Sequence, residues 1–209
     1  MATVKIKSPK GELRWVTITG EGKENLSGKK QFVASIVLDA SVPAHKEFMD
    51  SIDAYWEENK PAKYSLAPKS LGYTALTEKD KDGNKTEIPG MFYATFKTGV
   101  TFPDESTKVI DIYNAKGKKT SIGTQTIGNG SVGIIAGSMG IYENKKGNAI
   151  LNAGVTLYLD AIQLTKFVPY EHDAGFAAED DEDGWTGDDD SFEGVTEAAP
   201  TQTKTAPRL

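Results

Sequence analysis

The chain has 209 residues, of which 38% are hydrophobic, and its formal net charge is −6. This length suits one globular domain with an appendage, and no apolar run reaches the ~18 residues that span a membrane. The chain has no cysteine, which excludes disulfides, thiolate metal sites and a cysteine nucleophile, and the N-terminus has no secretory signal; both features favour the cytoplasm.

Two strands are predicted within the first forty residues. Residues 13–20 and 31–39 alternate apolar with polar side chains and are rich in β-branched and aromatic residues. The second strand places four apolar side chains on one face, which is expected to line the core. These side chains are Phe32, Ala34, Ile36 and Leu38.

One helix is predicted after these strands. Ser41 is expected to cap its N-terminus and Pro43 to occupy its first turn, and the Asn-Lys-Pro sequence at 59–61 is expected to end it. The apolar side chains recur at helical spacing, so one face of the helix should pack on a sheet. These side chains are Phe48, Ile52, Tyr55 and Trp56.

A β-meander is predicted to follow the helix. Residues 72–77 and 85–88 are expected to form strands on either side of a hairpin turn at Asp82-Gly83. Residues 91–98 form a further strand, in which period-two alternation separates a core face from an outer face. The core face holds Phe92, Ala94 and Phe96, and the outer face holds Tyr93, Thr95 and Lys97.

Three more strands complete the predicted folded part. Residues 109–115 form one of them and lead into a basic loop, and residues 131–142 and 155–167 form a long hairpin-like pair. Five or more strands, one helix and basic connecting loops predict a mainly β fold. The expected architecture is an OB-fold-like five-stranded barrel with extra hairpins and one capping α-helix.

The charge is divided unevenly along the chain. Residues 1–170 hold 22 basic and 18 acidic side chains, a net charge of +4, whereas residues 171–209 hold 2 basic and 12 acidic ones, a net charge of −10. The second segment contains AAEDDEDGWTGDDDSFEG and has no periodic apolar pattern, so it is expected to be disordered. The prediction is therefore an OB-fold domain over 1–170 and an acidic flexible tail over 171–209.

Two motif-like segments are better explained by turns than by ligand sites. GNGSVG at 128–133 has the glycine spacing of a dinucleotide site, but the residues after it continue as a strand and no βαβ unit surrounds it. DKDGNKTE at 80–87 lacks the glycine and glutamate positions of an EF-hand loop, so a solvated hairpin turn is expected there.

No catalytic set is visible in the sequence. The two histidines, His45 and His172, belong to no recognisable arrangement of nucleophile, base and orienting group. The sequence therefore predicts a protein that is not an enzyme and that uses no cofactor and no metal ion.

The most informative pattern is a strand aromatic residue followed by a lysine-rich loop. Single-stranded nucleic acid is held by a positive groove that follows the phosphates and by aromatic faces that stack on bases. A place in the core remains the alternative for each single aromatic residue. The predicted nucleic-acid contacts are Arg14, Trp15, Lys69, Tyr73, Tyr93, Lys97, Tyr113, Lys116, Lys118, Lys119, Tyr142, Lys145 and Lys146.

Two other functions are compatible with the sequence. The chain could be a β-rich structural or adaptor protein that does not bind nucleic acid, and burial of Trp15, Tyr93 and Tyr113 together would favour this alternative. The acidic segment could also imitate DNA and block a host protein. Mimicry usually needs a rigid array of carboxylates, however, and the glycines of DGWTGDDD argue against rigidity.

The segments VIDIYNAKGKKT and GNGSVGIIAGSMGIYENKKGNAILNAGVTLYLDAIQLTKF give the chain a family resemblance. It resembles the single-stranded DNA-binding proteins of tailed bacteriophages, in outline over residues 15–167 and most specifically over 109–167. The resemblance implies an OB-fold, sequence-independent binding of single-stranded DNA and a role in phage DNA replication or recombination, in the cytoplasm of a bacterial host.

The resemblance also implies a role for the acidic tail. In such proteins the tail competes with DNA for the basic groove and contacts replication and recombination proteins. Relatives that end on an acidic segment with a terminal aromatic residue differ from this chain, in which seventeen residues follow Phe192. The residues expected to act in the tail are Asp180, Asp181, Asp183, Trp185, Asp188, Asp189, Asp190 and Phe192.

Overall fold

The structure is a computed structural model that describes residues 3–25, 27–62, 64–79, 81 and 83–170. The predicted tail, 171–209, lies outside the described residues. In chain order the elements are β1 (Val4–Lys7), β2 (Gly11–Thr17), β3 (Lys23–Glu24), β4 (Lys30–Asp39), α1 (Pro43–Asn59), β5 (Tyr73–Lys79), β6 (Lys85–Gly99), β7 (Asp111–Tyr113), β8 (Lys119–Thr120), β9 (Ser131–Lys146) and β10 (Ala149–Lys166).

Five of the strands close into a barrel. Their order is β9, β2, β4, β6, β10 and back to β9, because β10 pairs with β9 along most of both strands. Neighbouring strands run antiparallel except β6 and β10, which pair in parallel where Phe96 lies beside Leu157. In chain order these are the five barrel strands of an OB-fold, so the predicted fold class is confirmed.

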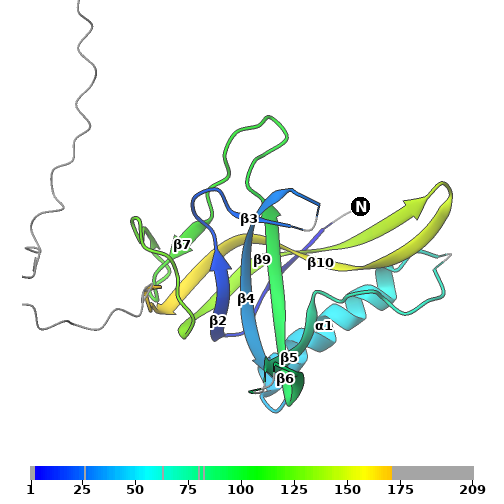
Figure 1. Ribbon diagram of the computed structural model, residues 1–209, viewed down its shortest axis with the longest axis horizontal. Coiled ribbons are helices and arrows are strands. Elements are labelled where there is room, and N and C mark those ends of the chain that lie inside the picture. Colours follow the sequence, from blue (N-terminus) through cyan, green and yellow to red (C-terminus); the bar gives the residue numbers. More distant parts are fainter. Residues whose placement is uncertain (1–2, 26, 63, 80, 82, 171–209) are drawn as a thin grey trace, which may run out of the picture. The chain divides into compact units, whose positions relative to one another are not determined.

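The remaining elements extend or cover the barrel. β1 pairs with β9, β3 with β4, β5 with β6, and β7 with both β10 and β8. Figure 1 shows the β9–β10 hairpin reaching beyond the barrel, with α1 running alongside it. The Tyr55 hydroxyl of α1 donates a hydrogen bond to the Met139 carbonyl of β9 at 3.4 Å.

The core follows the predicted periodicities. The four alternating apolar side chains of β4 are buried, and so is the apolar face of α1. Phe96 of β6 is fully buried and packs on Phe48 of α1, with ring centroids 6.4 Å apart. The helix therefore covers one part of the barrel core with its aromatic face, as the spacing of its apolar residues predicts.

The predicted cap of α1 is wrong. The N-cap residue is Val42, which makes no side-chain capping bond, whereas Pro43 does occupy the first turn. Ser41 instead donates two hydrogen bonds to the Asp39 carboxylate, from its amide at 2.8 Å and its hydroxyl at 2.6 Å. These bonds lower the pKa of Asp39. Ser41 is one residue too early to cap the helix and forms an Asx turn with Asp39 instead.

Several predicted strand limits are also wrong. Residues 85–88 and 91–98 belong to one continuous strand, β6, in which Gly90 has a φ of +76° without ending the pairing. Both arms of the β9–β10 hairpin are longer than predicted and meet at a turn at residues 147–148. Cross-strand hydrogen bonds hold the polar residues on either side of this turn in an extended conformation that their own propensities do not favour.

One glycine marks where β9 and β10 approach closely. A Cβ atom at Gly137 would lie 1.9 Å from the Tyr158 carbonyl oxygen, so no other residue fits without a backbone shift.

No helix in the described part of the chain is both long enough and apolar enough to cross a membrane.

Candidate nucleic-acid interface

The outer face of β6 is a polar and aromatic surface beside the buried outer side chains of β4. Direct pairing across the two strands puts Val33 beside Lys97, Ser35 beside Thr95 and Val37 beside Tyr93. Directly paired residues share a face, so the three β6 side chains point away from the core, as predicted. The hydroxyls of Ser35 and Thr95 are 2.9 Å apart and hydrogen-bonded.

A groove of about 660 Å³ lies along this surface. Its lining gathers five of the predicted contact residues, Lys69, Tyr73, Tyr93, Lys97 and Tyr142. The lining also includes Ser27, from the loop between the first two barrel strands, and Asn144, from the hairpin of the last two. OB-folds bind oligonucleotides on the face of strands 2 and 3, between these two loops. The groove lies between the same two loops and includes the outer face of the third barrel strand, β6, but no residue of the second, β4.

The groove is electropositive. Lys69 and Lys97 are exposed, and the lining, as far as the chain is described, contains no aspartate or glutamate. Four tyrosines contribute to it, the fourth being Tyr158. A surface with cations, aromatic rings and hydroxyls but no carboxylate suits a polyanion whose bases are unpaired.

Trp15 borders this surface in an unusual backbone conformation. The pairing of β2 with β4 shifts register between Arg14 and Thr17, and Trp15 has a φ of +52°. A left-handed conformation at a non-glycine residue costs about 1–2 kcal/mol. The side chain is 47% exposed, and its ring meets that of Tyr93 edge to face, with centroids 5.0 Å apart. The bulge therefore displays a large aromatic ring at the groove edge.

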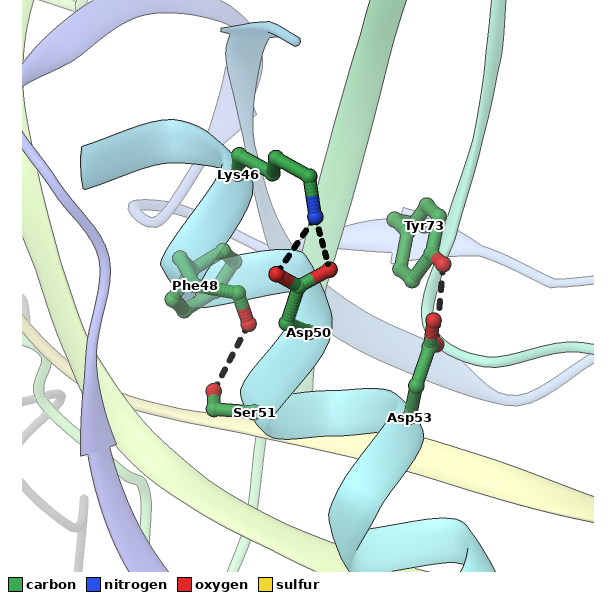
Figure 2. Close-up of polar contacts among 6 residues, drawn as sticks. All are labelled: Lys46, Phe48, Asp50, Ser51, Asp53 and Tyr73. Carbon is green, nitrogen blue, oxygen red and sulfur yellow. Dashed lines mark hydrogen bonds and ion pairs between the residues drawn. The ribbon is translucent and has the colours of Figure 1, made fainter. Parts of the chain in front are cut away.

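Tyr73 is at the groove but faces the interior. Its ring packs edge to face on Phe92, and its hydroxyl donates a hydrogen bond to the Asp53 carboxylate of α1 at 2.9 Å. Figure 2 shows this bond one turn beyond Asp50, which pairs with Lys46. Burial, and then the Asp53 carboxylate, strongly raise the pKa of Tyr73. These contacts tie β5 to the helix and leave little of the ring for stacking.

The predicted basic contacts differ in their partners. Arg14 pairs with Glu12 at 2.8 Å, Lys145 with Glu143 at 2.6 Å and Lys119 with Asp111 at 2.7 Å. The Asp111 pair raises the pKa of Lys119. Lys69, Lys97, Lys116, Lys118 and Lys146 are exposed and form no ion pair with any described carboxylate. Among these five, only Lys69 and Lys97 line the groove.

Tyr113 lies in a separate hollow. This hollow of about 450 Å³ is lined by Lys7, Tyr113, Gly117 and the outer faces of β9 and β10, including Gln163. The basic loop with Lys116, Lys118 and Lys119 follows Tyr113 and is near this hollow rather than among the groove's lining residues. The predicted contacts that combine an aromatic residue with a lysine-rich loop therefore lie at two separate places, the groove and this hollow.

Tyr158 was not predicted as a contact. It is 39% exposed on β10 and pairs in parallel with Lys97, which puts both side chains on the outer face. A Cβ atom at Gly140 would lie 2.8 Å from the Tyr158 ring, so the glycine leaves room for the ring against β9. Alternation along residues 155–159 could have indicated that Tyr158 points outward.

His45 has a structural role. The Asp39 amide donates to its Nδ1 at 2.9 Å, and its Nε2 lies 3.1 Å from the Lys10 carbonyl oxygen. The imidazole thus links the start of α1 to the segment before β2. In the part of the chain that the structure describes, no three His, Cys, Asp or Glu side chains are grouped to hold a metal ion. His172 and the eight tail residues lie outside the described part.

The sequence matches no family model and no curated protein. Among solved structures the fold is similar to gp2.5, a single-stranded DNA-binding protein encoded by bacteriophage T7. The TM-score is 0.54 and the identity 19%, over 90% of this chain and 100% of that one. It is also similar to the single-stranded DNA-binding protein of bacteriophage Enc34 in complex with single-stranded DNA, with TM-score 0.51 and 12% identity, over 80% and 89% of the two chains.

A C-terminally truncated form of the Enc34 protein gives a TM-score of 0.50 at 12% identity, over 79% of this chain and 88% of that one. At identities this low, the TM-scores show a shared fold alone, and the similarity extends over most of the chain. The chain has the fold of the bacteriophage single-stranded DNA-binding proteins.

Proposed function

We propose that this protein binds single-stranded DNA without sequence preference and does so in the groove lined by β5, β6 and β10. The observation that carries the proposal is the lining of that groove, which combines exposed Lys69 and Lys97 with aromatic rings and includes no described carboxylate. Its position on an OB-fold-like barrel supports the proposal, as does the similarity to a phage protein in complex with single-stranded DNA.

Each group in the groove has a distinct task in this mechanism. Lys69 and Lys97 contact phosphates as mobile point charges, which requires no particular base. Trp15 and Tyr93 offer ring faces and edges to bases, and stacking is tolerant of sequence because every base has a π-face. Duplex DNA would bind less well, since its bases are already stacked on one another. The protein is a binding module on this account and catalyses no reaction.

We further propose that the acidic segment 171–209 modulates this binding. A segment of net charge −10 tethered to a basic body competes with phosphates for the same cations. Trp185 and Phe192 are the aromatic residues of the acidic run, and we assign them to base-like contacts or to contacts with partner proteins of replication and recombination. The site of action would be the cytoplasm of a bacterial host.

A fluorescence titration tests the proposed function directly. Full-length protein is titrated into a labelled oligothymidylate and into a labelled duplex of equal length, over a series of salt concentrations. We expect binding to the single strand at low salt, weaker binding to the duplex, and a decrease in affinity as salt rises. Absence of binding to the single strand at low salt, both with and without the tail, would refute the proposal.

Burial of all three candidate aromatic residues would favour the adaptor alternative. Trp15 is 47% exposed, and Tyr93 and Tyr113 are half-buried at the edges of two hollows. This arrangement favours nucleic-acid binding over an adaptor without a nucleic-acid ligand.

A further inference from the structure

We infer that Asn129 is a positioning residue that holds Trp15 in its exposed, left-handed conformation, ready to stack on a base. The expected effect on DNA binding rests on the proposed function, whereas the positioning of Trp15 by Asn129 does not. The Asn129 side-chain oxygen accepts a hydrogen bond from the Trp15 amide at 3.1 Å, across 114 residues of sequence. A carboxamide from the turn before β9 thus fixes the backbone of a residue in β2.

The turn that carries Asn129 is itself firmly held. The Gly128 amide donates to the Val168 carbonyl oxygen at 2.8 Å. The Ser131 hydroxyl donates to the same carbonyl and accepts from the Val168 amide, both at 3.0 Å. A Cβ atom at Gly128 would lie 2.8 Å from the Pro169 carbonyl oxygen, so only glycine allows this approach. Bonds on both sides of Asn129 therefore fix where its side chain starts.

This geometry explains the GNGS sequence without a dinucleotide. Gly130 has a φ of +87°, which a residue with a side chain rarely adopts, and it turns the chain from Asn129 into β9. Gly128 provides close contact with the segment after β10, and Ser131 fastens the turn to that segment. Asn129 provides the side-chain oxygen that accepts a hydrogen bond from β2.

Trp15 needs such support because its bulge interrupts the regular ladder. The register shift between Arg14 and Thr17 takes Trp15 out of continuous pairing with β4. A bulky side chain disfavours a positive φ, so the backbone at Trp15 would relax toward an extended conformation if its amide were deprived of this acceptor. That relaxation would rotate the indole away from Tyr93, which it now meets at 5.0 Å. Preorganisation of the ring lowers the entropic cost of stacking.

The geometric half of the inference can be tested without DNA. Protein labelled with 5-fluorotryptophan gives one ¹⁹F resonance per tryptophan, and disappearance of a resonance in Trp15→Phe assigns that of Trp15. We expect Asn129→Ala to shift and broaden this resonance while leaving that of buried Trp56 in place, which also shows that the variant is folded. Asn129→Asp, which keeps an acceptor, should preserve the Trp15 resonance, and Asn129→Gln, which displaces the amide, should behave like Asn129→Ala.

The functional half is tested by a double-mutant cycle with labelled oligothymidylate. We expect Asn129→Ala to weaken binding about fivefold and Trp15→Ala about tenfold or more. The double variant should bind no more than about twofold more weakly than Trp15→Ala alone, because Asn129 acts through Trp15. Effects that multiply would show that Asn129 contributes independently and would overturn the inference.

An unchanged Trp15 resonance in Asn129→Ala would also overturn it, whatever the DNA result. If the wild-type protein bound no single-stranded DNA, the proposed function would fail, yet the ¹⁹F comparison would still decide whether Asn129 positions Trp15. The two failures are therefore distinguishable.

Discussion

The indole of Trp15 and the phenol of Tyr93 meet edge to face, with ring centroids 5.0 Å apart and planes inclined at 73°. The two residues come from β2 and β6, which do not pair with each other; β4 lies between them in the sheet. Contact across an intervening strand requires a ring that projects over β4, and the bulge at Trp15 provides it. The pair forms a continuous aromatic surface at the edge of the groove.

Removal of either ring should weaken single-stranded DNA binding. Trp15→Ala and Tyr93→Ala are each expected to reduce the binding free energy by on the order of 1–3 kcal/mol, the usual range for a base stacked on an aromatic side chain. Because the rings touch, the reduction in the double variant should be smaller than the sum of the two single reductions. The measurement is a fluorescence titration, with thermal unfolding to confirm that each variant folds.

Tyr113→Ala is the matched control for these variants, since it removes an aromatic ring from the other hollow. We expect it to change affinity less than either groove variant. A larger decrease in affinity for Tyr113→Ala than for Tyr93→Ala would indicate that DNA binds at the hollow that contains Tyr113. This result would contradict the proposed interface.

The lysines of the groove should determine much of the salt dependence. In Lys69→Gln/Lys97→Gln the slope of log affinity against log salt concentration is expected to become shallower by about 1.4, because each single-strand phosphate that a lysine neutralises adds about 0.7 to the slope. Lys116→Gln/Lys118→Gln makes the same change of charge outside the groove. Equal slopes for the two double variants would mean that overall charge, not the groove, attracts DNA.

The hydrogen bond from Tyr73 to Asp53 should matter for stability and not for DNA binding. Tyr73→Phe keeps the ring on Phe92 and is expected to cost about 1 kcal/mol of unfolding free energy, with DNA affinity changed less than twofold. A decrease in affinity as large as that of Tyr93→Ala would instead show that Tyr73 stacks on DNA.

The stability difference between wild type and Tyr73→Phe should depend on alkaline pH. The pKa of Tyr73 is raised from its ordinary value of 10.0, so the folded protein retains the phenolic proton longer than the unfolded chain does. The stabilisation by Tyr73 is fully present below pH 10 and decreases as pH rises beyond it. Urea unfolding of both proteins between pH 7 and about 11 measures the trend; a difference that grew above pH 10 would contradict it.

Deletion of the tail should increase DNA affinity. A chain that ends before Glu179 is expected to bind single strands several-fold more tightly than the full chain, most clearly at low salt, where screening is weakest. A full-length variant with Asp180, Asp181 and Asp183 changed to Asn is the matched control for charge, and it should show part of the increase. Unchanged affinity at low and moderate salt would remove the competition proposal and leave the binding proposal intact.

The sequence by itself determined the local periodicities. Alternation identified the buried face of β4 and the outward direction of Tyr93 and Lys97, and helical spacing identified the aromatic face of α1. These properties depend on neighbouring residues only, since a strand repeats every two residues and a helix every 3.6. Composition likewise separated the basic body from the acidic segment, because charge and apolar content require no tertiary contacts to be counted.

Only the tertiary structure decided which predicted contacts share a surface. Tyr73 has the same strand context as Tyr93, but its pairing partner is Ala94, so its ring turns inward to Phe92 and Asp53. Tyr113 pairs with β10 and lies at another hollow. Strand register and barrel closure fix these positions through hydrogen bonds between segments far apart in the chain, and a shift by one residue would reverse each face.

The role assigned to Asn129 depends on the same long-range geometry. In the sequence it is the middle of a glycine-rich stretch, and nothing near it predicts a partner. Closure of the barrel pairs β9 with β2 and thereby brings the turn before β9 to the bulge in β2. A hydrogen bond across 114 residues can form only once the strands between them have paired, which is why the positioning of Trp15 emerges from the fold.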